Sequence, residues 1–257
     1  MLKLVLFLIL NSYIVNSWAS NDLRELEYAE EIEATFSTGK IVWLALKDKK
    51  FLALYTETEK INNQGTAIIL HPMDGHPDQK KLINPLRTYL PQHNWATLSL
   101  QMPVMGIGAK EEEYYPLFDD AKKRVQAGID YLVAAEVKNI VLIGYGMGAM
   151  MAVNSIKDDA DATHIKAVVT ISLGVPKSDK KQVQIIDFIN KIEQPFLDIF
   201  AEFDLPEVTD SARERQIAGK ASSAYRQFQI KGEGHTFQHD DGLVVKRVYS
   251  WINLTFR

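Results

Sequence analysis

The stretch NIVLIGYGMGAMMAV, residues 139–153, constrains the fold of this chain more than any other part of the sequence. Its first five residues form a mostly apolar run with the length of a buried strand. Glycine then occupies the alternate positions 144, 146 and 148, and the small, apolar residues that follow are typical of a buried helix. The pattern predicts a strand that passes through a sharp turn directly into a helix. It leaves open what the turn is for.

Short apolar runs and longer helical patterns alternate along most of the 257 residues. The expected strands are Ile41–Leu46, Phe51–Tyr55, Thr66–Leu70, Trp95–Leu100, Asn139–Ile143, Ala167–Ser172, Phe196–Phe200 and Tyr225–Ile230. The expected helices are Leu82–Leu90, Tyr115–Ala135, Gly148–Lys157, Val183–Ile192, Ala212–Ser222 and Leu243–Asn253. The first two strands, joined by a charged turn, form a hairpin pattern. We therefore expect one α/β domain over residues 41–257, with a mostly parallel central sheet and helices on both faces.

The N-terminus has the pattern of a secretory signal peptide over residues 1–19. Lys3 precedes an apolar run at 4–10, and Ser17-Trp18-Ala19 offers small residues at the two positions that a signal peptidase reads. The apolar run is too short to span a bilayer, and no cysteine follows it that a lipid could modify. We expect cleavage after Ala19, an acidic N-terminal segment at 20–40 that is helical or loose, and no membrane span afterwards. An uncleaved anchor or an internal strand is the alternative.

Composition excludes several classes of protein. The chain is 46% hydrophobic and 24% charged, with a net charge of −4 and mixed charges along its length. This is ordinary globular composition without the basic face that a nucleic-acid partner needs. The absence of cysteine excludes disulfides and thiolate chemistry.

Two residues late in the chain complete a constellation with the glycine turn. Asp204 follows the strand expected at 196–200, and His235 lies in a glycine-bearing loop after the strand at 225–230. In chain order, the turn at 144–148, Asp204 and His235 resemble the nucleophile elbow, acid and histidine of an α/β-hydrolase. The resemblance covers roughly residues 40–257. It implies an α/β-hydrolase-like fold, with Asp204 and His235 as the remnant of a catalytic triad.

Gly146 occupies the place of the nucleophilic serine in that elbow. The elbow normally holds its nucleophile at positive φ, which costs about 1–3 kcal/mol for a residue with a Cβ. Glycine relieves this strain but has no side chain for histidine to activate. The sequence therefore predicts that the turn is kept and the nucleophile is lost.

The oxyanion side of the expected site is also altered. The strand at 66–70 leads into His71-Pro72-Met73-Asp74-Gly75. Proline has no N–H to donate, so the remaining backbone donors for an oxyanion-like site are Met73 and Met147.

Two longer stretches make the resemblance more specific. Residues 71–104, with His76-Pro77-Asp78 and Asn94-Trp95, and residues 224–237, AYRQFQIKGEGHTF, resemble an exported proteobacterial family of unknown function with an α/β-hydrolase-like fold. This resemblance implies that glycine at position 146 is the family pattern, and that the protein is periplasmic or secreted in a Gram-negative bacterium. It implies no established substrate or activity.

Other chemistry has weaker support. Ser99 and Ser172 lie in or at the end of strands, where a structural role is expected, and Asp74 is expected in a turn. The turn at 144–148 lacks the early position and the later acidic residue of a dinucleotide site, so no cofactor is expected. Metal binding needs three or four converging ligands. No HxH or HExxH spacing joins the candidate ligands, and we expect no metal at His71, His76, His235, His239 and Asp240.

Three functional hypotheses follow. The favoured one is a non-catalytic pseudo-hydrolase that binds a small ligand or a protein partner in the cell envelope. The alternative is an active esterase- or peptidase-like hydrolase, in which Asp204 and His235 activate water or an unrecognised nucleophile. The third is a structural envelope component whose cleft is filled by side chains.

Overall fold

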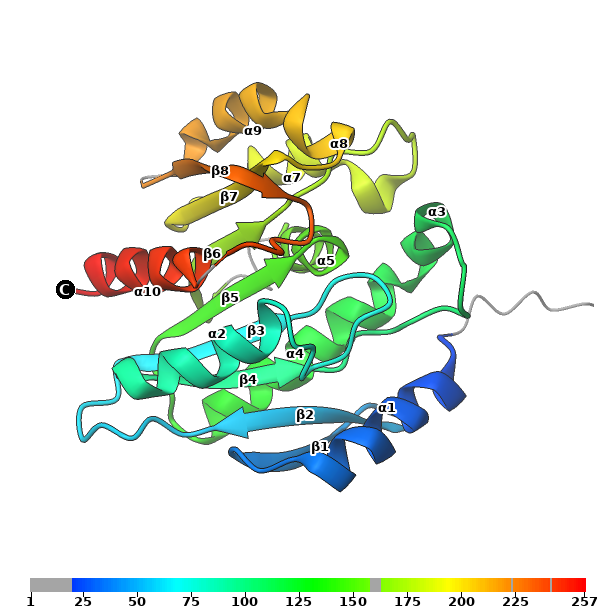
Figure 1. Ribbon diagram of the computed structural model, residues 1–257, viewed down its shortest axis with the longest axis vertical. Coiled ribbons are helices and arrows are strands. Elements are labelled where there is room, and N and C mark those ends of the chain that lie inside the picture. The colour runs from blue at the N-terminus through cyan, green and yellow to red at the C-terminus, as the bar shows by residue number, and fades with distance from the viewer. Residues whose placement is uncertain (1–19, 158–162, 223, 241) are drawn as a thin grey trace, which may run out of the picture.

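The computed structural model describes residues 20–157, 163–222, 224–240 and 242–257. The expected signal peptide at residues 1–19 lies outside the described residues. A single eight-stranded sheet has the order β1-β2-β4-β3-β5-β6-β7-β8 (Figure 1). The two pairs β1–β2 and β2–β4 are antiparallel, and all the others are parallel. The expected mostly parallel α/β sheet is therefore confirmed.

All eight expected strands are present, and six of them are one to three residues longer than the apolar runs. Their bounds are β1 Lys40–Ala45, β2 Lys50–Thr56, β3 Gly65–Leu70, β4 Trp95–Leu100, β5 Ile140–Tyr145, β6 Ile165–Ile171, β7 Phe196–Phe203 and β8 Arg226–Gly234. The largest extensions are at the carboxyl ends of β7 and β8, where Phe203 pairs with Gly234 after a register shift. Apolar patterning does not detect exposed strand ends.

The expected helices are also present; all are shorter than expected except the last, Leu243–Thr255, which is two residues longer. The α-helices are α1 Asp22–Thr35, α2 Ile83–Tyr89, α3 Glu111–Tyr114, α4 Phe118–Ala134, α5 Met147–Ser155, α7 Ile185–Ile189, α8 Pro206–Thr209, α9 Ala212–Ala218 and α10 Leu243–Thr255. Short 3₁₀ helices are η1 Leu90–His93, η2 Tyr115–Leu117, η3 Lys181–Val183 and η4 Gly219–Ala221. The helix expected at 115–135 starts at Phe118 because Pro116 lacks a backbone donor and sits in η2. Helical periodicity does not indicate α3 and α8, because each has only four residues.

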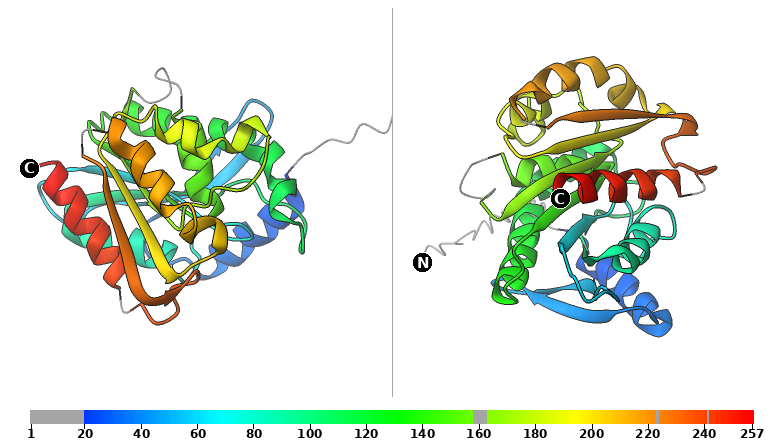
Figure 2. Two further views of the ribbon diagram at one scale, coloured as in Figure 1. Left: turned by 90° about the horizontal axis from the view of Figure 1, so that it is seen from above. Right: turned by 90° about the vertical axis from the view of Figure 1, so that its left-hand side faces the viewer.

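Two apolar cores lie on opposite faces of the sheet. One joins β-strand side chains to α4, α5 and α7, and the other joins them to α2 and α10. The two views of Figure 2 show these helices on either side of the strands. Because β3, β5, β6 and β7 are parallel, their carboxyl ends meet at one edge, and the residues that follow them come together there.

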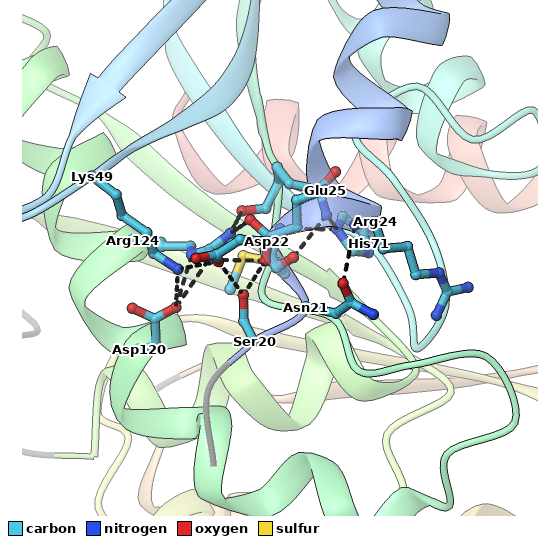
Figure 3. Close-up of polar contacts among 11 residues, drawn as sticks. Ser20, Asn21, Asp22, Arg24, Glu25, Lys49, His71, Asp120 and Arg124 are labelled. Atoms are coloured by element: carbon cyan, nitrogen blue, oxygen red, sulfur yellow. Dashed lines mark hydrogen bonds and ion pairs between the residues drawn. The ribbon is translucent and has the colours of Figure 1, made fainter. Parts of the chain in front are cut away.

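The segment at 20–40 includes helix α1, which packs on the outside of the β1–β2 hairpin. Its buried face, with Ala29 and Ile32, contacts Leu52 and Leu54 of β2. Figure 3 shows the polar side of this contact, where Arg124 of α4 meets carboxylates from two helices. The fully buried Arg124 pairs with Glu25 at 2.8 Å and with Asp120 at 2.9 Å. The N-terminal helix is thus fixed to the sheet by an apolar face and a charge network. No helix among the described residues is long and apolar enough to cross a bilayer.

Candidate functional site

The glycine turn has the backbone of a nucleophile elbow. Gly146 links β5 to α5 with φ 55° and ψ −120°, a conformation that strains any residue with a Cβ. Its N–H donates to Ile171 O at 2.9 Å, and its carbonyl accepts from Ala149 N at 2.9 Å. The two outer glycines are needed for close packing: a Cβ on Gly144 would lie 2.4 Å from Gly148 O, and one on Gly148 would lie 2.5 Å from His71 O. Sequence and geometry therefore agree on the turn.

Asp204 and His235 form a hydrogen-bonded pair beside this turn. His235 Nδ1 lies 2.7 Å from Asp204 Oδ1, and the Asp204 side chain is fully buried while 29% of the His235 side chain is exposed. Asp204 also accepts from the backbone N–H groups of Ala201 at 3.0 Å and Leu205 at 2.9 Å. Burial alone raises the pKa of Asp204, but its hydrogen bonds, led by that of His235, outweigh burial and lower the pKa below its usual value. The carboxylate is therefore held ionised and aimed at the imidazole.

Ser172 also belongs to this site, although the sequence predicted only a structural role for it. It follows β6, adopts φ 52°, and its hydroxyl donates to Asp204 Oδ2 at 2.5 Å. The expectation of a structural role fits this contact, since the hydroxyl orients Asp204. The only signal in the sequence was its place at the carboxyl end of the strand beside β5.

Tyr145 holds the loop that carries His235. Its hydroxyl donates to His235 O at 2.8 Å, and its ring lies 5.8 Å from the imidazole and 6.1 Å from Phe237, centroid to centroid. Position 145 of the turn therefore fixes the histidine loop, which nothing in the sequence pattern indicated.

A cavity of about 150 Å³ lies where a serine side chain would point. Its lining includes Gly146, His235 and Ser172. A Cβ built on Gly146 would lie 3.9 Å from His235 Cε1 and 3.2 Å from Pro72 Cβ. The hypothesis of a cleft filled by side chains is therefore wrong, because open space remains next to the histidine.

The two expected oxyanion-like donors, Met73 and Met147, both line this cavity. Within the described part of the chain, neither backbone N–H has a protein acceptor. Met147 begins α5, so its N–H also carries the positive end of the helix dipole. Both N–H groups therefore remain available to an acceptor atom of a bound molecule.

His71 lies beneath the turn that carries Met73 and is buried. Its Nδ1 donates to Pro72 O at 2.8 Å, and its Nε2 accepts from Met102 N at 2.9 Å. Burial disfavours the charged ring and lowers the pKa of His71 to about 3. His71 is therefore a neutral residue that ties the 71–75 turn to the chain after β4.

The burial of His71 predicts a pH dependence of stability. Below pH 6.5 the unfolded chain binds a proton that the folded chain binds only near pH 3, so stability is lost as pH falls through this window. The slope is up to about 1.4 kcal/mol per pH unit. The variant His71→Gln has no such titration. The difference in the free energy of unfolding between wild type and variant therefore becomes smaller from pH 6.5 toward pH 3. Urea unfolding at half-unit pH steps measures this difference; a constant difference contradicts a buried neutral His71.

The remaining candidate residues lie apart from one another. Asp74 is in a turn, where its carboxylate accepts from Arg24 at 2.6 Å and from Tyr114 at 2.8 Å. The His76 ring lies 5.2 Å from that of Tyr28, centroid to centroid, with the two planes tilted by 38°. The others are also dispersed: His239 is exposed, Asp240 accepts from the first N–H groups of α10, and the Ser99 hydroxyl is buried without a partner. Across the described ranges, no three His, Asp or Glu side chains converge as metal ligands.

Known proteins resemble this chain in sequence and in fold. The sequence matches a family described as "Protein of unknown function (DUF3530)" over residues 21–114 and 117–254. No curated protein matches it. Among solved structures, Est1E from Butyrivibrio proteoclasticus is 17% identical with a TM-score of 0.64, over 84% of this chain and 98% of its own.

Two further structures are similar to the same extent. The Pyrococcus furiosus esterase Pf2001 is 16% identical with a TM-score of 0.68, over 85% of this chain and 93% of its own. XC6422 from Xanthomonas campestris, described as an α/β serine hydrolase without a lid, is 14% identical with a TM-score of 0.64, over 86% of this chain and 94% of its own. At such identities the likeness establishes the α/β-hydrolase fold and leaves the activity open.

Proposed function

We propose that this chain, which belongs to the DUF3530 family of proteins of unknown function, is a non-catalytic member of the α/β-hydrolase fold. It binds a small ligand in the cavity beside Gly146. The observation that carries the proposal is Gly146 itself: the elbow turn is present at φ 55°, and the atom that attacks a substrate is absent.

The features around Gly146 support ligand binding. The cavity of about 150 Å³ is open next to His235, and the N–H groups of Met73 and Met147 lack protein acceptors among the described residues. A carbonyl or carboxylate oxygen of a bound molecule is the acceptor that such N–H groups take. The pair Asp204–His235 then serves as a polar wall of the pocket.

The proposal includes export to the cell envelope of a Gram-negative bacterium, where the ligand or a protein partner is met. Its support is the N-terminal pattern of Lys3, the apolar run at 4–10 and Ser17-Trp18-Ala19. Helix α1 adds support, because its first residues are fixed directly after the expected cleavage point: Asn21 N donates to Val104 O at 2.7 Å. Mass spectrometry of the protein from a periplasmic extract tests this, and a mature chain that begins at Ser20 is expected.

Turnover of short acyl esters separates this function from active hydrolysis. The wild-type protein and His235→Ala are expected to show the same rate with p-nitrophenyl butyrate, because no nucleophile depends on the histidine. A wild-type rate at least ten-fold above that of His235→Ala contradicts the proposal and establishes general-base hydrolysis through the Asp204–His235 pair.

A further inference from the structure

One turn of the chain, at residues 72–75, forms the wall of the ligand pocket that faces Gly146. Pro72 and Met73 both line the cavity of about 150 Å³, and a Cβ at position 146 would lie 3.2 Å from Pro72 Cβ. The turn is closed by a hydrogen bond from Gly75 N to Pro72 O at 3.1 Å. A movement of this turn therefore changes the space beside Gly146.

Asp74 of this turn is held from outside by two helices. Its Oδ1 accepts from Arg24 NH1 of α1 at 2.6 Å and from Tyr114 Oη of α3 at 2.8 Å. Its backbone carbonyl accepts from Tyr28 Oη of α1 at 3.0 Å. Asp74 has φ 58°, a left-handed conformation that is uncommon for residues with a Cβ. Three hydrogen bonds thus fix this conformation, and we call the four residues the Asp74 clasp.

Arg24 is the charged link of the Asp74 clasp. Its side chain is only 12% exposed, and one nitrogen, NH1, donates both to Asp74 Oδ1 and to Met105 O, the latter at 2.8 Å. Another ion pair, between Lys49 and Asp22 at 2.7 Å, joins the same turn of α1 to the β1–β2 hairpin (Figure 3). The two ion pairs allow the clasp to be tested separately from the docking of the helix.

We propose that the three residues that bond Asp74 are positioning residues of the ligand pocket, because they keep Pro72 and Met73 in place against Gly146. Helix α1 therefore shapes the pocket although none of its residues lines the cavity. Without these bonds the turn keeps its anchor at the other end, where His71 Nδ1 donates to Pro72 O at 2.8 Å. The inference rests on the proposed function and assigns one wall of that pocket to α1.

Backbone order parameters of the amides at 73–75, measured by NMR on the full chain, test the clasp. In Arg24→Leu they are expected to fall from about 0.85, the value of rigid backbone, to about 0.6. Tyr28→Phe, a milder change, is expected to lower them less. Lys49→Leu is the matched control and is expected to leave them unchanged. Arg24→Lys is expected to preserve them, since one ammonium can donate to both acceptors of NH1.

A kinetic measurement separates positioning of the pocket from a purely structural role. In the Gly146→Ser background, adding Arg24→Leu is expected to lower kcat with p-nitrophenyl butyrate by about ten-fold or more, because the turn that carries Met73 is displaced. Adding Lys49→Leu is expected to leave kcat unchanged. If Gly146→Ser is inert, the order parameters alone decide.

Three results overturn the inference: rigid amides at 73–75 in Arg24→Leu, an equal loss of order in Lys49→Leu, or a loss of order that leaves kcat of an active Gly146→Ser unchanged. If Arg24→Leu does not fold, unchanged order in Tyr28→Phe overturns it instead. Wild-type ester turnover that depends on His235 contradicts the proposed function alone, because the order parameters are measured without substrate.

Discussion

Gly146→Ser is expected to hydrolyse short acyl esters that the wild-type chain leaves intact. A Cβ at this position lies 3.9 Å from His235 Cε1, which brings the added hydroxyl within reach of the free Nε2. Asp204 already lies 2.7 Å from Nδ1, and the same cavity is lined by Met73 and Met147, the two expected oxyanion donors. General-base catalysis contributes about 10²–10⁴-fold, so Gly146→Ser/His235→Ala is expected to be slower than Gly146→Ser by that factor. Initial rates with p-nitrophenyl butyrate measure it.

The gain of activity comes with a loss of stability. Position 146 keeps φ 55°, which costs a residue with a Cβ about 1–3 kcal/mol, and Pro72 must move by a few tenths of an ångström to accept a contact of 3.2 Å. Gly146→Ala is the matched control, because it has the same strain and no hydroxyl. If Gly146→Ser folds as well as Gly146→Ala and is equally inert, the Asp204–His235 pair is not in triad geometry.

Arg215→Met is expected to destabilise the protein by about 3–5 kcal/mol. The Arg215 Nε donates to Asp198 Oδ2 at 2.8 Å, and both side chains are fully buried. The same carboxylate oxygen accepts from Tyr225 Oη at 2.9 Å and from Gln227 Nε2 at 2.9 Å. Removal of the guanidinium leaves a buried charge with neutral donors alone. Urea unfolding measures the loss.

Arg215 also holds in place two helices, α8 and α9, that line a second cavity, of about 580 Å³. Its NH1 donates to Val208 O at 2.6 Å and to Ser211 Oγ at 2.7 Å, which fixes α8 and α9 against β7. Arg213→Met, on the exposed side of the same helix, is expected to change stability by no more than about 0.5 kcal/mol. Arg215→Met/Asp198→Asn is expected to recover part of the loss, since no unpaired charge remains. A loss below about 1 kcal/mol in Arg215→Met contradicts this description of the network.

The sequence predicted the elements of the site that depend on chain order. Asp204 and His235 each follow a strand of a parallel sheet, so their meeting at one edge follows from topology. The glycine at position 146 was informative because a turn with positive φ favours glycine in the sequence.

Contacts between segments far apart in the chain have no local sequence pattern from which they can be predicted. Ser172 touches Asp204 only because β6 and β7 are neighbours, and α3 and α8 are too short for helical periodicity to indicate where their carboxylates lie. His71 was considered as a metal ligand, and only its burial shows that it is neutral. Likewise, nothing in the sequence paired Asp198 with Arg215.

The intact mass after incubation with a fluorophosphonate probe tests most directly whether the nucleophile is absent. The wild-type chain is expected to keep its mass, and Gly146→Ser is expected to gain one adduct that maps to position 146. An adduct on the folded wild-type chain, for example on Ser172 beside Asp204, would contradict the account, because it would reveal a working nucleophile in the site.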